Sequence, residues 1–200
     1  MKWTILLLAV LLCITGCSIG KVASNSCEII DDITEKEDCY VKLASSTLNP
    51  DYCEKINSPL TVDYCHEEIA VSSKDLSKCH AITSKYWLDV CYKEIAKATL
   101  NPSPCFALSA VSDKIECFDF IGQKENDYTI CQEIPDVEKS DNCVKKVAYA
   151  LNDSNVCLQM SSKLLASACQ GNLAIRLKDK SLCSNISIVE IKEECIKQLS

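Results

Sequence analysis

The chain has 200 residues, of which 21 are basic and 28 acidic, so its net charge is −7. Such an acidic balance excludes the basic surface that binds nucleic acid or anionic lipid. Sixteen cysteines against four glycines are the strongest compositional signal, and they favour a disulfide framework.

The N-terminus carries the pattern of an export signal. Lys2 precedes an apolar run without charges, Trp3 to Ile14, and the run ends in two small residues followed by Cys17. Residues 1–16 are therefore predicted to be a signal peptide, residues 17–26 a short tether, and residues 27–200 a single repeat domain.

The segment Ile14-Thr15-Gly16-Cys17 resembles the lipobox of prokaryotic lipoproteins. This resemblance implies cleavage after Gly16 and lipidation of Cys17. An uncleaved membrane helix over residues 3–20 is the alternative, and either anchor places the protein on the non-cytoplasmic side of a membrane. Loss of Lys2 leaves a mature net charge of about −8.

Fourteen cysteines follow a strict rhythm in which gaps of twelve and fourteen residues alternate, giving seven repeats of 26 residues. A fixed period of this length indicates stacked repeats, each contacting mainly its neighbours. The cysteines are Cys27, Cys39, Cys53, Cys65, Cys79, Cys91, Cys105, Cys117, Cys131, Cys143, Cys157, Cys169, Cys183 and Cys195.

Each repeat has the pattern of a helical hairpin. Six of seven repeats place Asn or Asp four residues before the first cysteine, as in Asn49 and Asp75, which is typical of a helix N-cap. An aliphatic residue follows the first cysteine by three positions, and another follows the second by four, as in Ile56 and Ile69. The next position is always small, which permits close approach of neighbouring helices.

The predicted fold is therefore an all-α solenoid of seven helical hairpins, each stapled by one disulfide. Loop entropy does not choose between the two regular pairings, since the free energies of closing their loops differ by only about 0.1 kcal/mol. Parity does: pairing within repeats uses every cysteine, whereas pairing between repeats leaves Cys27 and Cys195 alone. Such disulfides persist in oxidising compartments, as export requires.

The sequence argues against enzymatic, metal and redox chemistry. Cys65-His66 and Cys79-His80 are the best local metal-ligand pairs, but no two repeat cysteines have the close spacing of zinc ligands. A C-x-x-C motif, a G-x-S-x-G motif and a phosphate-binding glycine loop are all absent from the sequence. We expect no cofactor, no metal and no catalytic residue.

Binding is the remaining class of function, and one repeat position suggests where. Rings follow the second cysteine in the first four repeats, and Trp87 lies nearby. Such residues either form a stripe that contacts a peptide or glycan, or pack between hairpins. This predicted ligand stripe consists of Tyr40, His66, Trp87, Tyr92 and Phe118.

In concept only, the repeats resemble the cysteine-rich Sel1-like proteins of bacteria, which are secreted solenoids of disulfide-tied helical hairpins. The resemblance implies action by contact, and it transfers no residues. The sequence thus favours a membrane-anchored extracytoplasmic module that binds protein, peptide or glycan and no nucleic acid. The alternative is a structural or self-assembling envelope spacer without a small ligand, and a redox or metal-binding cysteine protein comes third.

Overall fold

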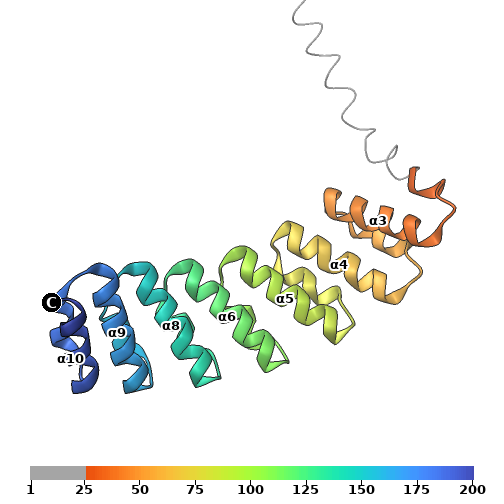
Figure 1. Ribbon diagram of the computed structural model, residues 1–200. Helices are drawn as coiled ribbons and strands as arrows, with labels where there is room; N and C mark the ends of the chain where they lie inside the picture. The colour runs from red at the N-terminus through yellow and green to blue at the C-terminus, as the bar shows by residue number, and fades with distance from the viewer. Residues whose placement is uncertain (1–25) are drawn as a thin grey trace, which may run out of the picture. The chain divides into compact units, whose positions relative to one another are not determined.

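The structure is a computed structural model that describes residues 26–200. The chain divides into two compact units, the first ending at Cys91 and the second running from Tyr92 to Ser200. The described part of each unit contains helices and no strand. The all-α repeat predicted from the sequence is confirmed, and Figure 1 shows its long helices.

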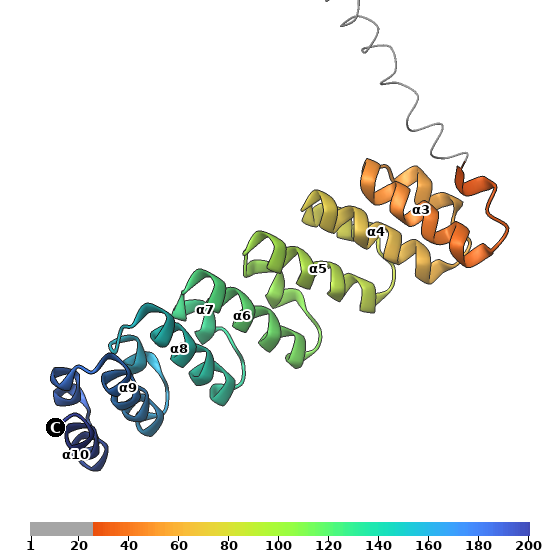
Figure 2. The same ribbon diagram turned by 45° about the horizontal axis from the view of Figure 1, so that its top comes forward.

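Long α-helices alternate with short helices throughout both units. The first unit contains a short turn of helix at residues 26–28, then α3 (Ile33–Thr47), η2 (Pro50–Lys55), α4 (Pro59–Ser73), η3 (Leu76–Ala81) and the start of α5 (Lys85–Thr99). The second unit contains the rest of α5, then η4 (Ser103–Ala107), α6 (Val111–Glu125), α7 (Tyr128–Gln132), α8 (Val137–Leu151), η5 (Val156–Gln159), α9 (Lys163–Leu177), η6 (Lys180–Asn185) and α10 (Val189–Gln198). Within this unit, α6, α8, α9 and α10 lie side by side in chain order (Figures 1 and 2).

The short helices carry the first cysteine of each repeat and the long helices carry the second. Five of the short helices, η2 to η6, are 3-10 helices, and α7 has α geometry. Such short 3-10 segments are common connectors between α-helices. The second cysteine is the seventh residue of every long helix, so successive long helices begin 26 residues apart.

Seven disulfides join the two helices of each hairpin, and they are the pairs within repeats that parity predicts. Their Cα–Cα distances lie between 5.6 and 6.0 Å, the usual range for an unforced bridge. The pairs are Cys27–Cys39, Cys53–Cys65, Cys79–Cys91, Cys105–Cys117, Cys131–Cys143, Cys157–Cys169 and Cys183–Cys195. Disulfides at this density indicate an oxidising environment.

A single left-handed residue connects each long helix to the next repeat. Lys178 is one of these residues, with a φ of 55°, and the following Asp179 donates its backbone N–H to the Ala174 carbonyl of the helix just ended. The Asp179 side chain then accepts the N–H of Ser181 and begins the next short helix. The predicted N-caps are confirmed in the same way at Asn49, Asp75 and Asp127. Asn101 and Asp153 also accept the N–H two residues on, but their short helices begin later, after Pro102 and Asn155.

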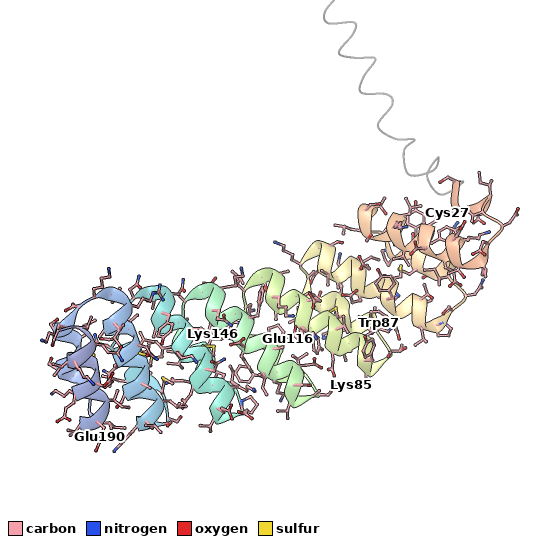
Figure 3. The ribbon with its side chains drawn as sticks, in the orientation of Figure 1. Cys27, Lys85, Trp87, Glu116, Lys146 and Glu190 are labelled. Atoms are coloured by element: carbon pink, nitrogen blue, oxygen red, sulfur yellow. A yellow bond between two sulfur atoms is a disulfide. The ribbon has the colours of Figure 1, made fainter. Side chains whose placement is uncertain are left out.

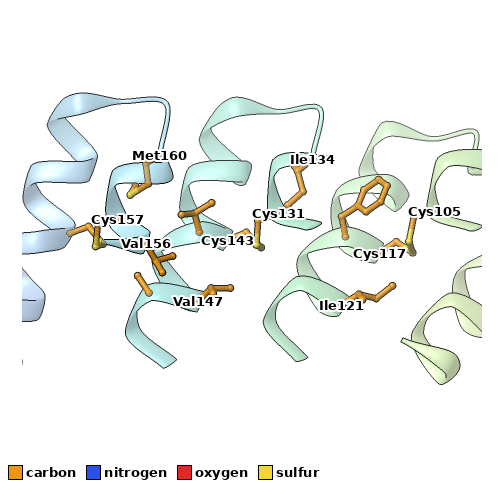
Figure 4. Packing of buried hydrophobic residues seen from close by; sticks show 14 of the residues in the cluster. Cys105, Cys117, Ile121, Cys131, Ile134, Cys143, Val147, Val156, Cys157 and Met160 are labelled. Carbon is orange, nitrogen blue, oxygen red and sulfur yellow. A yellow bond between two sulfur atoms is a disulfide. The ribbon is translucent and has the colours of Figure 1, made fainter. Parts of the chain in front are cut away.

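The core lies between the long and short helices and is built around the disulfides, as Figure 4 shows for part of the second unit. The small position after each aliphatic is fully buried at Ala148 and Ala174, as the sequence predicts. At Gly122 the approach is closest, because a Cβ there would lie 2.9 Å from the Cys131 sulfur. This contact explains why the fourth repeat has glycine at that position.

The predicted signal peptide, Cys17 and nearly all of the predicted tether lie outside the described residues. Within residues 26–200, no helix combines the length and the apolar character needed to cross a membrane.

Candidate functional site

Buried carboxylates at the fifth position of the long helices hold the next hairpin in place. Asp141 on α8 accepts the backbone N–H groups of Ser161 and Ser162, at 2.7 and 3.1 Å. Glu37 and Asp63 accept the equivalent pairs of N–H groups in the first unit. These acids are consumed by backbone hydrogen bonds, so we assign them to the fold and not to a site.

The fourth repeat lacks this acid for a reason that the structure makes plain. Ile115 occupies the position on α6, and the residue that would donate to it in the next loop is Pro135, which has no N–H. Ile115 packs against the hydrophobic core instead. On α9 a third arrangement occurs, in which the hydroxyls of Ser167 and Ser187 are 3.0 Å apart.

The predicted ligand stripe is wrong at two of its five positions. Tyr40 and Phe118 are each only 1% exposed and belong to the hydrophobic core. The Tyr40 hydroxyl lies beside the Glu28 carboxylate without reaching hydrogen-bond geometry, and burial, together with this carboxylate, raises the pKa of Tyr40 to about 12. Tyr92 is half-buried against the core of its unit. For these rings the packing alternative holds.

His66 is half-buried and lines a cavity of about 190 Å³ with Pro50, Lys78 and Ala81. Burial lowers the pKa of His66 below its ordinary value, against the opposing effect of the Asp63 and Glu54 charges. Within residues 26–200, no group of three His, Cys, Asp or Glu side chains is arranged to hold a metal ion, either around His66 or elsewhere.

Trp87 belongs to a cluster of three rings in the first unit. Its ring centre lies 5.1 Å from that of Tyr64 and 5.2 Å from that of Tyr86, and Figure 3 marks its place on the long-helix side. Tyr86 is the most exposed of the three. Burial, then Glu68, raises the pKa of Tyr64 to about 12, so this phenol stays protonated. Within the cluster only the Tyr86 ring is exposed, whereas Tyr64 and Trp87 are half-buried.

A groove in the second unit is formed by two neighbouring cavities. A cavity of about 470 Å³ between α8 and α9 adjoins one of about 280 Å³ between α9 and α10, and Ala168 and Asn172 line both. Their small and short side chains leave room between the helices. We call the joined cavities the α8–α10 groove; the apolar side chains that line it are Met160, Leu165, Ile175 and Ile191.

Two carboxamides line the α8–α10 groove without a hydrogen-bond partner. Asn142 on α8 lines the larger cavity, and Asn172 on α9 lines both cavities. Neither side chain donates or accepts a hydrogen bond within the described part of the chain. Each amide therefore offers one acceptor oxygen and an NH₂ donor to a ligand, the same groups that a peptide main chain presents.

Two charged residues on the groove, Lys145 and Glu190, have no ion-pair partner among the described residues, whereas Glu194 lies 3.9 Å from Lys197 on the same helix. Lys146 on α8 pairs with Asp119 on α6 at 3.0 Å, whereas the adjacent Lys145 lines the groove and forms no ion pair with any described residue. Glu190 on α10 likewise lines the groove without an ion pair to residues 26–200. Figure 3 labels Lys146 and Glu190. Free charges of both signs at one groove are suited to a charged ligand.

Each long helix also exposes an apolar side chain in its first turn. These side chains are between 54% and 68% exposed, and they recur once in every repeat. They are Ile33, Leu60 and Tyr86 in the first unit, and Val111, Val137, Leu164 and Val189 in the second. We call this set the first-turn apolar row.

The sequence reasoning missed the groove because its residues differ from repeat to repeat. A method that aligns repeats searches for what recurs, and Asn142 and Asn172 occupy different positions in their helices. The available signal was the loss of charge along α9, whose middle carries Ala168, Gly171 and Asn172. The first-turn apolar row recurs once in every repeat, at the first or second position of the long helix, and was open to detection.

Comparison with known protein families, with curated proteins and with solved structures gives no match to this chain.

Proposed function

We propose that the protein is an extracytoplasmic binding module, anchored to a membrane at its N-terminus, whose ligand is a protein, peptide or glycan held on the face of the long helices. Seven disulfides support the location outside the cytoplasm. The lipobox-like segment ending at Cys17 supports the anchor. We assign no catalytic role to any residue.

The α8–α10 groove is the observation that carries this proposal. It combines an apolar floor with two unbonded carboxamides and unpaired charges, which is the composition of a binding site rather than of a closed helix junction. The α5–α6 junction of the same unit shows the contrast, because there Lys93 and Lys97 are neutralised by Asp113 and Glu116.

Site-specific photo-crosslinking in cells that express the full chain tests the proposal. A benzophenone amino acid placed at Asn172 is expected to form a discrete adduct, and the same probe at the exposed Glu133 serves as control. The variant Ala168→Arg fills both cavities and should abolish the adduct, whereas Ala150→Arg on the exposed part of α8 should not. Absence of an adduct at Asn172, or an identical adduct at Glu133, would refute the groove as the binding site.

The anchor has its own test. Incorporation of radiolabelled fatty acid into the full chain is expected, and Cys17→Ser should eliminate it and release the protein from the membrane fraction. Retention of the Cys17→Ser variant in the membrane supports the uncleaved helix instead.

A second function, self-assembly as an envelope spacer, is favoured by the first-turn apolar row. A second copy of the chain presents the same row of apolar side chains, one in every repeat. Light scattering during size-exclusion chromatography separates the functions, since self-assembly predicts oligomers that Val137→Lys together with Leu164→Lys would dissociate. A monomer at all concentrations removes this second function.

A further inference from the structure

We infer that the ligand of the α8–α10 groove is an extended peptide segment that carries an acidic side chain toward α8 and a basic side chain toward α10. This inference rests on the proposed binding function and specifies the chemistry of its ligand. It follows from three properties of the groove: its free amides, its polarity of charge, and its span.

The free amides select for a peptide main chain. Asn142 and Asn172 each present a donor and an acceptor, and the main chain of an extended peptide presents the complementary pair at every residue. A helical ligand satisfies its own main-chain groups and gains nothing from these amides. An extended segment leaves its groups free, so it is the form that matches them.

The polarity of charge fixes the side chains of the ligand. The α8 side of the groove carries Lys139 and Lys145 against Glu138, which leaves an excess positive charge there. The α10 side carries Glu190, which has no ion-pair partner among the described residues, and Glu194, which lies 3.9 Å from Lys197; no basic residue lines the groove there. A carboxylate near α8 and an ammonium or guanidinium group near α10 therefore complement the groove.

The span of the groove sets the spacing between those side chains. Neighbouring packed helices lie about 8–10 Å apart, so the path from α8 to α10 covers about 16–20 Å. An extended chain advances by about 3.3 Å per residue and alternates its side chains between two faces, so the acidic and basic side chains that both face the groove lie about six positions apart.

Fluorescence anisotropy with labelled nonapeptides tests the inference on the purified mature protein. The probes have a Ser, Ala and Val background and carry one Glu and one Lys about six positions apart, which keeps both side chains on one face of an extended chain. Controls carry the same two residues side by side, or carry neither. The spaced probe is expected to bind at least fivefold more tightly than both controls and to weaken as salt is raised.

Paired lysine variants test whether the groove does the binding. Lys145→Glu is expected to weaken the spaced probe about fivefold or more, while Lys146→Glu, on the same helix and with the same charge change, has less than a twofold effect. A probe with its Glu replaced by Lys should recover affinity on Lys145→Glu alone. Combined replacement of Asn142 and Asn172 by Ala should weaken every probe about tenfold.

Three outcomes would overturn the inference: equal binding of all probes, equal effects of the two lysine variants, or binding of neutral oligosaccharides in place of the peptides. Each is distinguishable from failure of the proposed function. A groove-dependent photo-adduct at Asn172 together with any of these outcomes retains the binding module and removes only the peptide. Circular dichroism of each variant confirms that the hairpins remain folded.

Discussion

Removal of the buried carboxylate of Asp141 is expected to destabilise the second unit by about 2–4 kcal/mol. Asp141 is only 2% exposed and accepts two N–H groups, from Ser161 and Ser162. Hydrogen bonds to a charged acceptor contribute about 1.5–3 kcal/mol each. Ser161 is exposed and Ser162 is half-buried, so water partly replaces the lost acceptor at both donors. Because of this partial compensation, the expected loss of stability is about 2–4 kcal/mol and not the ~3–6 kcal/mol that two such hydrogen bonds would contribute in full.

The variants Asp141→Ala and Asp141→Asn test the reasoning together. An asparagine retains one acceptor oxygen but turns an NH₂ group toward the second N–H, so it should destabilise nearly as much as alanine. Urea unfolding followed by circular dichroism, with the disulfides intact, measures the change in free energy. Hydrogen exchange at Ser161 and Ser162 gives a local measurement that does not depend on two-state unfolding.

The exposed Glu133, which forms no ion pair with residues 26–200, provides the control, and Glu133→Ala should change stability by less than about 0.5 kcal/mol. Our account of the buried acids fails if Asp141→Ala falls within the same limit, or if Asp141→Asn behaves as the wild type.

Three further perturbations have expected results. Gln170→Leu should stabilise the protein by about 1–2 kcal/mol in urea unfolding, because this buried amide has no partner among the described residues and the preceding repeat has Val144 at the same place; destabilisation would contradict this. Lys178→Gly should raise stability by about 0.5–1 kcal/mol, since Lys178 adopts a left-handed φ, and Asn152→Gly should raise it less, because asparagine tolerates that conformation; equal effects would refute the explanation. Glu28→Gln should lower the melting temperature at pH 6 but not near pH 2. The Tyr40 hydroxyl and nearby lysines hold the pKa of Glu28 at about 2, below its usual 4.5, so the stability that the Glu28 carboxylate contributes is present above about pH 5 and is lost as the pH falls. A difference in melting temperature that persists near pH 2 would refute this explanation.

The recurring features of the chain were predictable because they follow from spacing alone. A cysteine at the seventh position of a helix, with an aliphatic residue four positions later, lies on the face that packs against the preceding short helix, as Cys143 and Val147 show. The pairing within repeats followed from parity, and the Asp or Asn caps followed from side-chain chemistry. These features depend on contacts within about one hairpin, where residues that are close in sequence are also close in space.

The aromatic stripe was mispredicted at Tyr40 and Phe118 because it combined two helix positions that lie in different environments. The residue after the second cysteine faces the interior, so Tyr40 and Phe118 are buried with Val144. Trp87, by contrast, is the third residue of its helix and belongs to an outward ring cluster. Ring character alone does not separate these cases, since aromatic side chains serve core and contact surface equally well.

The recurring acids of the long helices could be found by aligning the repeats, but the alignment does not tell whether their side chains face solvent or the interior. A carboxylate stands two residues before the second cysteine in five repeats, as Asp63 and Asp141 illustrate, and such recurrence of an acid inside a helix has two explanations, a solvated face or a buried acceptor. The contacts decide between them. Glu37, Asp63 and Asp141 each accept two backbone N–H groups of the next loop, so the recurring acid is a buried acceptor. Two repeats lack it: Ile115 stands where Pro135 removes one of the two donors, and Ser167 contacts the Ser187 hydroxyl instead.

The same logic separates the α8–α10 groove from the rest of the long-helix face. At the α6–α8 junction of the second unit, the charges of Lys146 and Asp119 neutralise each other in an ion pair within the chain. Along the groove, Lys145 and Glu190 remain without a counter-charge in the described part of the chain, beside two amides without hydrogen bonds. Polar groups that have no partner within the protein are available to bind a ligand. Specific binding in a repeat array is therefore expected at the junction where such groups gather.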